Sequence, residues 1–398
     1  MLLTTIGEAF EINPQVRIPK GTEVPFVSMD QVVPGQRNVS AAEKRLFKGG
    51  SKFEHGDTLM ARITPCLENK KIAQYLPPNH ASPSAGSTEF IVIRGKNGVS
   101  ITPFAYYFVQ SPDIHELAIS LMTGTSGRQR VDTEAFRMSE IWLPNLTTQE
   151  KIVRVLGSLD DKIAVNNKMI RIILELQKSI WIQNNVKNLS QIHLINIAEP
   201  ILGGTPKRSD NSLWNGDILW ASVADMTSVS NSHLLTTAEQ ITEKAAETKR
   251  FAPLPTGSVL LSARGTVGHV ISLATPAAFN QSAYGFIAPK GYETALRLAI
   301  EDTVEELKSK SYGSVFSTIT KQQINECLIP DVFNESFAEL HAKLNSLETR
   351  IVIAEQENQT LARTRDELLP LLMTGKITVQ DAEEVSAEVG VDKHEVEE

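Results

Sequence analysis

Basic and amide side chains gather in predicted loops at comparable places in the two halves of the chain. The candidates are Arg62, Lys70, Lys71, Arg128, Gln129, Arg130, Lys207, Arg208, Arg264, Asn280, Gln281 and Lys321. Arginine and lysine suit phosphates and guanine edges, whereas asparagine and glutamine suit adenine edges. Any one of these side chains is equally consistent with a solvated loop charge. As a set on two similar halves, they favour contact with DNA.

Motifs for catalysis are missing from the sequence. It has no GxxxxGK[ST] phosphate loop, no GxGxxG after a predicted strand, no HExxH pair and no GxSxG elbow. The segment Gly203–Asp210 contains a glycine pair without the spacing of a nucleotide cradle, and we interpret it as a flexible loop that exposes its two basic residues. The segment Glu89–Lys96 lacks the preceding aspartate of a nuclease site and is interpreted as an ordinary strand and loop. The sequence therefore predicts neither catalysis nor a metal site.

A stretch of the first half, Gly127–Pro144, returns in the second half as Gly313–Pro330. In both copies a glycine and a proline stand at the same spacing, and a glutamate precedes the proline by four positions. This alignment places Met138 opposite Ile324, Ile141 opposite Cys327, Trp142 opposite Leu328 and Leu143 opposite Ile329. The recurrence predicts an internal duplication of about 190 residues rather than a short-period solenoid. Arg128–Arg130 correspond to Ser314–Phe316, so this loop is predicted to differ in preference between the copies.

Each copy leads into a seven-residue apolar repeat, which predicts a long helix. The first seam is Ile152, Leu156, Leu159, Ile163, Asn166, Ile170, Ile173, Gln177 and Ile180; the second is Phe337, Leu340, Leu344, Leu347, Ile351, Ala354, Asn358, Leu361, Arg365, Leu368 and Leu372. Thr147 and Glu150 have capping-box spacing, and Gly375 suits a helix end. The narrow stripes favour an antiparallel coiled coil over the core of a helical bundle. Asn166 and Asn358 interrupt the seams, where they either fix the register or mark a frayed stretch.

The segments outside the long helices are rich in short β-type runs separated by Gly, Pro, Asn and Ser. Gly56–Leu76 is predicted to form strand, tight turn and strand, and Gly257–Ala274 is predicted to do the same. Arg62 and Arg264 stand at similar places, just after the first apolar run of each. The pattern predicts two globular units of one architecture with divergent surfaces.

Net charge is unevenly distributed along the chain. The formal charge is −8, but residues 331–398 alone contain 6 basic and 16 acidic residues. Residues 377–398 are therefore expected to form a disordered acidic tail, and the remainder is nearly neutral. The two cysteines lack metal-ligand spacing, no apolar run approaches ~18 residues, and the N-terminus does not resemble a secretion signal. These features predict a cytoplasmic protein without a membrane span.

Several stretches together resemble the DNA-specificity subunit of type I restriction–modification enzymes. They are GDTLMARITPCLENKK, GGTPKRSDNSLWNGDILW, GSVLLSARGTVG, FNQSAYGFIAP and the closing RDELLPLLMTGKI. The resemblance covers residues 1–380, and it rests also on the order of the parts. It implies an α+β fold in which two mixed α/β target-recognition domains alternate with two long helices that pair as an antiparallel coiled coil, with a pseudo-two-fold internal repeat. The expected domains are 1–145 and 186–331, the spacer helices 146–185 and 332–376, and the tail 377–398.

The resemblance also implies the partners. Each recognition domain would read one half of a bipartite site on double-stranded DNA, and the helices would separate the readers and dock two methyltransferase subunits. This chain would be non-catalytic and bind no cofactor; S-adenosylmethionine would belong to the methyltransferase subunits, and ATP with Mg²⁺ to the restriction subunits. The alternatives are the specificity subunit of a type IIB-like or fused restriction system, a coiled-coil scaffold that binds protein, and a cryptic nuclease or methyltransferase.

Overall fold

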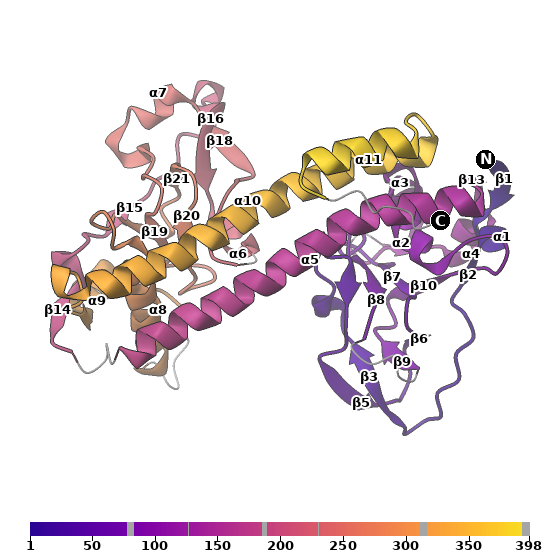
Figure 1. Cartoon of the computed structure of the whole chain (residues 1–398), viewed down its shortest axis with the longest axis horizontal. Coiled ribbons are helices and arrows are strands. Elements are labelled where there is room, and N and C mark those ends of the chain that lie inside the picture. The colour runs from indigo at the N-terminus through magenta and orange to yellow at the C-terminus, as the bar shows by residue number, and fades with distance from the viewer. Residues whose placement is uncertain (78–82, 126, 185–188, 230, 311–316, 392–398) are drawn as a thin grey trace. The chain divides into compact units, whose positions relative to one another are not determined.

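The computed structural model describes residues 1–77, 83–125, 127–184, 189–229, 231–310 and 317–391, and the chain forms two compact units. Unit 1 comprises Met1–Val165 and Glu357–Glu398, and unit 2 comprises Asn166–Gln356. The division passes through two long helices, α5 (Leu146–Gln183) and α10 (Ala338–Thr374), so each unit contains a part of both (Figure 1). In the described ranges, no helix is long and apolar enough to cross a membrane.

Unit 1 is built on two larger sheets and two short ladders. The main sheet has the order β2 (Phe10–Ile12), β10 (Phe90–Gly95), β7 (Thr58–Ala61), β8 (Ile72–Tyr75) and β4 (Asn38–Val39). The second sheet has the order β5 (Glu43–Leu46), β3 (Glu23–Val27), β9 (Ser84–Gly86) and β6 (Ser51–Phe53). The ladders are β1 (Leu2–Thr5) with β13 (Glu140–Leu143) and β11 (Met122–Thr123) with β12 (Arg130–Val131). The shorter helices are α1 (Ile6–Ala9), η1 (Met29–Gln31), α2 (Thr102–Gln110), α3 (Pro112–Ser120), α4 (Thr133–Met138) and α11 (Val379–Glu388).

The main sheet of unit 1 is the middle of three layers. Along β10, Phe90 and Val92 face the core shared with the second sheet, whereas Ile91 and Ile93 face the core shared with α2 and the long helices. This alternation follows from the two-residue period of a strand, so both faces must be apolar. Helix α2 lies between the sheet and α5, which explains why Phe104–Val109 are all buried.

Unit 2 has the same layers. Its main sheet has the order β15 (Ile201–Leu202), β22 (Ala283–Phe286), β19 (Val259–Ser262), β20 (Val270–Leu273) and β17 (His233–Leu234). Its second sheet has the order β18 (Glu239–Ile241), β16 (Trp214–Ala221) and β21 (Ala277–Phe279), and β14 (Gln191–His193) pairs with β23 (Leu328–Pro330). The shorter helices are η3 (Leu194–Asn196), η4 (Asn211–Leu213), α6 (Val223–Ser228), α7 (Glu243–Ala246), η5 (Lys249–Phe251), α8 (Glu293–Lys310), α9 (Lys321–Glu326) and η6 (Glu335–Phe337).

The two units repeat one strand order, except that the second sheet of unit 1 has the additional strand β6. In both main sheets the last strand is parallel to its neighbour, β4 to β8 and β17 to β20, and the other neighbours are antiparallel. In both second sheets an antiparallel edge strand precedes a parallel pair, β3 with β9 and β16 with β21. The predicted α+β fold with duplicated mixed units is confirmed.

Hydrogen bonds shift the repeat by two positions from the predicted alignment. The Ile6 amide donates to the Ser139 carbonyl at 3.0 Å, and the Leu194 amide donates to the Cys327 carbonyl at 3.0 Å. These are equivalent contacts at the short ladder of each unit, so Cys327 corresponds to Ser139. The predicted alignment, which placed Ile141 opposite Cys327, is therefore wrong.

Burial explains the alignment error. Phe136 of α4 and Ile324 of α9 are 0% and 1% exposed and become equivalent in the corrected alignment, whereas Met138, which the predicted alignment placed opposite Ile324, is 62% exposed. The chance recurrence of a glycine and a proline outweighed the core pattern in the predicted alignment. Its loop comparison involved Ser314–Phe316, which lie outside the described residues.

The long helices bury the predicted seams within each unit. In unit 1, α5 and α10 share a core that includes Leu156, Leu159, Leu361 and Leu368; in unit 2, they share one formed by Ile170, Ile173, Ile351 and Ala354. They run antiparallel in unit 1, where Asp160 contacts Arg365 and Lys162 contacts Glu357. Supercoiling into a coiled coil stays a prediction. So does a register role for Asn166, which is 4% exposed, and for the half-buried Asn358.

The ends of the long helices differ in part from expectation. The Asn145 side chain accepts the Thr148 amide at 2.9 Å and caps α5, so the predicted capping box of Thr147 and Glu150 is wrong. Asparagine is as good a cap as threonine, and the box spacing occurred inside the first turn. Gly375 ends α10 with a φ of +68°, as predicted.

The predicted disordered tail is wrong for residues 379–388, which form α11 in unit 1. The Thr378 side chain caps this helix, and Asp381 completes a capping box. Ala382 is fully buried in the core of unit 1, and Glu383 contacts Arg154 of α5 at 2.5 Å. The acidic composition of this segment predicted disorder, but α11 is amphipathic and has one apolar face. Residues 392–398 lie outside the described ranges.

In both units the helix that covers the main sheet makes a buried polar junction with the long helices. In unit 1, the Tyr107 hydroxyl of α2 donates to Asp160 at 2.7 Å, and Arg365 donates to the other oxygen of Asp160 at 2.6 Å. In unit 2, the Arg297 guanidinium of α8 donates to Gln177 at 2.8 Å and to Glu348 at 2.9 Å. Each junction ties a globular layer to the helices.

Candidate nucleic-acid interface

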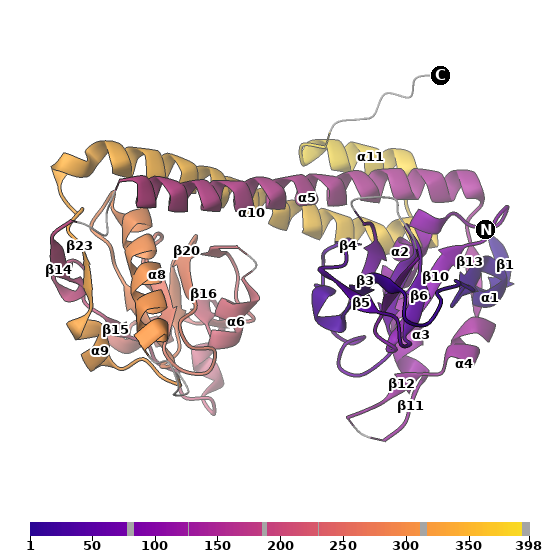
Figure 2. The ribbon, with the colours of Figure 1, turned by 90° about the horizontal axis from the view of Figure 1, so that it is seen from below.

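Three loops of unit 1 converge around the carboxylate of Glu89. They are the turn between β9 and β10, the segment after β7 and the β11–β12 hairpin, which projects on the side away from α5 (Figure 2). Backbone hydrogen bonds join them: the Thr64 amide donates to the Gln129 carbonyl at 3.1 Å, and the Val131 amide donates to the Arg62 carbonyl at 2.8 Å. The fold thus brings together candidates that are far apart in the chain.

Glu89 holds one predicted arginine and lies near another. Arg130 donates to both Glu89 oxygens at 2.7 to 3.1 Å, and the nearest Arg62 nitrogen is 3.8 Å from the carboxylate. The hydrogen bonds and charge of Arg130 lower the pKa of Glu89 despite partial burial. The guanidinium is presented in one orientation, because a bidentate pair fixes its plane. The Arg130 side chain remains 42% exposed.

The remaining candidates of unit 1 divide between two places. Arg128 is exposed in the β11–β12 hairpin, and the Gln129 amide donates to the Thr64 hydroxyl at 3.0 Å. Lys71 donates to the Met29 carbonyl at 2.9 Å, so its ammonium is engaged by the chain itself. Lys70 is exposed, with a φ of +51°, and borders a hollow that is also lined by Arg365 of α10. Lys70 is thus placed beside the long helix rather than beside Glu89.

In unit 2, Arg208 is held by an acidic and an aromatic neighbour. It donates to both carboxylate oxygens of Glu239, its guanidinium carbon is 4.0 Å from the ring centre of Trp214, and Trp220 is 5.1 Å away. The Trp214 indole donates to the Lys207 carbonyl at 3.3 Å, and the Trp220 indole donates to the Gly204 carbonyl at 2.9 Å. Two indoles and a stacked arginine thus hold the Gly203–Asp210 loop in place, and its two basic residues are exposed, as predicted.

The other candidates of unit 2 lie near the turn between β21 and β22. The Gln281 side chain accepts from the Thr205 hydroxyl at 2.5 Å, and the Asn280 side chain accepts from the Ser282 amide at 3.0 Å. The Arg264 amide donates to the Ser282 carbonyl at 3.2 Å. The exposed side chains are those of Arg264, Gln281, Lys207 and Lys321, the last at the start of α9.

Arg62 and Arg264 are not equivalent positions. The Val131 amide donates to the Arg62 carbonyl, whereas the matching Ile319 amide donates to the Ala263 carbonyl at 3.0 Å. Arg62 therefore corresponds to Ala263, and Arg264 lies one residue further on. Successive side chains of an extended segment point to opposite faces, so the two arginines are presented differently.

The acidic and aromatic partners of the arginines are not predicted from the sequence. Glu89 is predicted to lie in an ordinary strand and loop, and no role is predicted for Glu239, Trp214 or Trp220. An acidic residue beside an arginine cluster is visible in the sequence only when the contact is local. Glu89 and Arg130 are 41 residues apart, and Arg208 and Glu239 are 31 apart.

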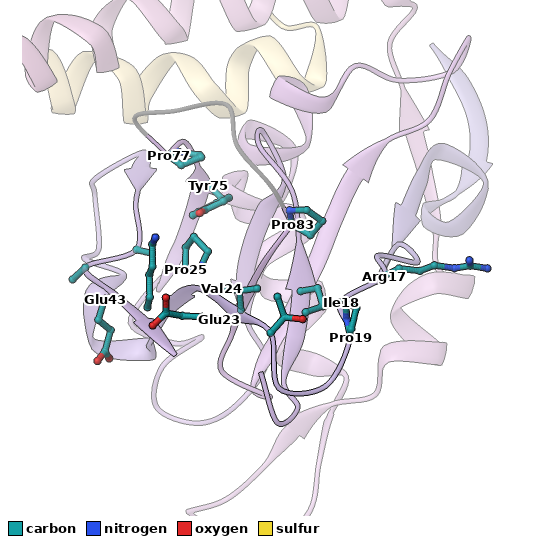
Figure 3. A pocket seen from close by; sticks show the side chains of 14 residues that line it. Arg17, Ile18, Pro19, Glu23, Val24, Pro25, Glu43, Tyr75, Pro77 and Pro83 are labelled. Carbon is teal, nitrogen blue, oxygen red and sulfur yellow. The ribbon is translucent and has the colours of Figure 1, made fainter. Parts of the chain in front are cut away.

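A groove of about 690 Å³ lies elsewhere in unit 1, beside β3 and β5. Four prolines, at 19, 25, 77 and 83, line it together with Tyr75, as Figure 3 shows. Its charged lining is mixed, with Arg17 and Lys44 against Glu23 and Glu43. This composition does not make a basic surface, so the groove is separate from the candidate interface.

No group of three or more metal-ligating side chains occurs among the residues that the structure describes. The arrangement around the arginines suits binding: it offers rigid guanidinium donors and amide groups on ordered turns, the types of group that contact phosphates and base edges.

Comparisons with known proteins agree with this chemistry. A family model described as type I restriction modification DNA specificity domain matches residues 68–175 and 186–335. The chain is 30% identical over 155 residues to the specificity subunit of the type I restriction enzyme EcoAI from Escherichia coli, covering 38% of this chain and 26% of that protein. It is 27% identical over 175 residues to the MjaIX specificity subunit from Methanocaldococcus jannaschii, covering 43% of this chain and 40% of that protein. These alignments span less than half of either relative.

A solved structure has a similar fold over nearly the whole chain. It is the type I restriction-modification system S subunit from M. genitalium, with a TM-score of 0.53 and 14% sequence identity. The match covers 93% of this chain and 95% of that one. At this identity the likeness concerns the fold alone.

Proposed function

The chain belongs to the type I restriction modification DNA specificity family, whose model matches more than half of its 398 residues, and we propose that it reads a bipartite DNA sequence with one half-site for each unit. The proposal rests on the duplicated frame, that is, on the strand order and turns that the two units share. Two units with the same strand order present different side chains on matching turns. One frame with two surfaces is suited to bind two different short sequences.

Phosphate contact would come from basic surface around the readers. In unit 1, the edge strand β5 is exposed along its whole length and carries Lys44 and Arg45, and Lys48 is exposed just after it. Lysines and arginines on such an edge can release counterions from DNA, which makes the affinity fall as salt rises. Base edges would be contacted by the turns described above.

The long helices would dock methyltransferase subunits. On α5 of unit 2, Met169, Ile172 and Leu176 are 38%, 55% and 45% exposed and follow a three- and four-residue spacing. They lie beside the buried face of the helix, so the apolar surface is wider than the pairing with α10 requires. An exposed apolar stripe at helical spacing is the surface that a partner helix covers.

The chemistry of methylation and restriction would belong to other subunits. This chain would contribute recognition and no catalysis, with S-adenosylmethionine bound by the methyltransferase subunits and ATP with Mg²⁺ by the restriction subunits. The host cytoplasm is the compartment in which such a complex meets DNA.

Electrophoretic binding to random-sequence duplex DNA tests the proposal. The full chain, purified with its methyltransferase subunit, is expected to shift the duplex at low salt and to release it as salt rises. The absence of a shift at low salt would contradict DNA recognition and favour the alternative of a protein-binding scaffold. A type IIB-like or fused system gives the same shift and is distinguished by the subunits that copurify.

A further inference from the structure

Each unit contains the same three-residue turn between its second sheet and its main sheet. Turn 1 is Ser87–Glu89, between β9 and β10, and turn 2 is Asn280–Ser282, between β21 and β22. In both turns the middle residue is exposed and its two neighbours are half-buried. The middle residue is Thr88 in turn 1 and Gln281 in turn 2.

Equivalent hydrogen bonds fix the two turns. The first residue donates its amide to the end of a second-sheet strand, its side chain caps the amide of the third residue, and its carbonyl accepts from the following strand. The distances are 3.1, 3.2 and 3.3 Å for Ser87 with Val27, Glu89 and Phe90, and 2.9, 3.0 and 3.4 Å for Asn280 with Ala221, Ser282 and Ala283. The backbone frame is the same, although serine caps one turn and asparagine the other.

The third residue of each turn anchors the loop that carries the candidate arginines. The Glu89 carbonyl accepts the Arg62 amide at 2.9 Å, and the Ser282 carbonyl accepts the Ala263 amide at 2.7 Å. In unit 1 the side chains of Arg62 and Arg130 thus lie beside turn 1 through Glu89, whereas in unit 2 the Ser282 carbonyl accepts the backbone amide of Arg264. Arginine side chains on both loops are suited to contact phosphates.

Turn 2 is further held by the glycine pair of the Gly203–Asp210 loop. A Cβ at Gly203 would lie 2.4 Å from the Asn280 carbonyl oxygen, so only glycine permits this approach. This close approach places Thr205 beside Gln281. The Thr205 hydroxyl contacts the side-chain oxygen of Gln281 and not its side-chain nitrogen. A side chain held in this way loses little freedom when it binds a ligand.

Building on the proposed function, we propose that Thr88 and Gln281 are base-reading positions of the two half-sites. A glutamine amide offers the donor and acceptor pair that matches adenine in the major groove, and a threonine offers a hydroxyl and a methyl group, the latter suited to thymine. The shared frame presents both side chains from the same point of the fold. Differences in half-site sequence then arise at one exchangeable residue without a change in the backbone.

Selection from randomised duplex DNA by the full chain with its methyltransferase subunits tests this assignment. Gln281→Ala is expected to reduce the preference at one position of one half-site by roughly fivefold to a hundredfold, the range for losing one side chain–base pair. The other half-site is expected to be unchanged. Thr88→Gln is expected to alter one position of the opposite half-site only.

Two matched variants distinguish base contact by Gln281 from a structural role of Gln281 in the loop. Thr205→Val removes the hydroxyl that holds Gln281, so it is expected to weaken the preference at the position that Gln281→Ala affects, and by less than Gln281→Ala does. Gln191→Ala removes an exposed glutamine side chain of β14, away from turn 2, and is expected to keep both the fold and the preference. If Gln191→Ala reduces the preference as much as Gln281→Ala does, or if Thr205→Val alters a different position, the effect does not come from base contact by Gln281 and the assignment is wrong.

The outcomes also distinguish this inference from the proposed function. If the wild type selects a bipartite sequence and Gln281→Ala leaves both halves intact, the turn assignment is overturned while the proposed function stands. If the wild type selects no bipartite sequence, the proposed function itself is overturned, and the turn assignment with it.

Discussion

Charged side chains buried at the junctions explain how each globular layer is held to the helices. Asp160, whose side chain is 3% exposed, accepts from Tyr107 and Arg365, and Arg297 is 1% exposed beside Glu348. A buried charge without its partner is strongly unfavourable, whereas a satisfied set fixes one geometry. The junctions thus favour a single orientation of each layer on its own part of the helices.

Asp160→Asn is expected to destabilise unit 1 by about 3 kcal/mol, the lower end of the range for breaking a buried ion pair, because Asp366 still contacts Arg365. Asp161→Asn is the matched control: the Asp161 side chain is 66% exposed, and its loss is expected to cost under about 1 kcal/mol. Urea unfolding with hydrogen exchange of α2 measures both. Equal effects would show that the buried charge does not hold the junction.

His233 of β17 predicts a pH dependence of unit 2. Burial alone would lower the pKa of His233, but Glu348 at 3.1 Å and Glu355 at 2.8 Å outweigh it and raise this pKa to about 9. A raised pKa stabilises the fold fully below about pH 6.5, the value in an unfolded chain, and the stabilisation is lost as the pH rises through about 9. The loss is of the order of 3 kcal/mol.

Unfolding of the full chain between pH 6 and pH 10, followed by tryptophan fluorescence, measures this loss. Trp214 and Trp220 report on unit 2. His233→Asn is expected to be less stable below pH 9 and to lack the decline. A wild-type decline that persists unchanged in His233→Asn would assign it to another group.

At the scale of helices and strands, the elements best predicted from the sequence are those in which apolar residues recur at one regular spacing. The heptads of both long helices predicted their buried faces, because apolar residues at this spacing all lie on one side of a helix. The apolar runs of Gly56–Leu76 and Gly257–Ala274 likewise predicted the paired strands β7 with β8 and β19 with β20. The capping residue of α5, the α11 helix and the correct alignment of the repeat were missed, because each depends on which of several similar residues meets a distant core.

The candidate site was predictable as residue types and not as contacts. Arg130 and Arg208 were chosen for their chemistry, but no pattern indicated that Glu89 and Glu239 hold them. Lys71 looked equivalent to them in sequence, yet it is engaged by the Met29 carbonyl. Pairing between such distant positions depends on strand order, which single-sequence patterns do not specify.

Ile172→Asp is expected to release the methyltransferase subunit without unfolding the chain, because Ile172 is 55% exposed on α5. Arg171→Asp is the control, since it lies about 100° around the helix from Ile172, away from the apolar stripe. Copurification of the subunits and circular dichroism measure association and fold. Retention of the subunit by Ile172→Asp would place the docking surface elsewhere.

At the scale of the whole molecule, the duplication predicts modular recognition. Replacing residues 186–330 with the matching segment of another family member is expected to change one half of the recognised sequence and leave the other half intact. The replaced segment contains every described strand of unit 2, with the parts of α5 and α10 retained. Selection from random duplex DNA measures both halves, and a change in both would contradict one reader per unit.

Mapping methylated bases across the genome of the host tests the central claim most directly. With the chain present, we expect methylation at two short sequences separated by a gap of fixed length, and we expect this pattern to vanish when the chain is deleted. A continuous motif, or a bipartite pattern that persists after deletion, would contradict the assignment of DNA recognition to its two units.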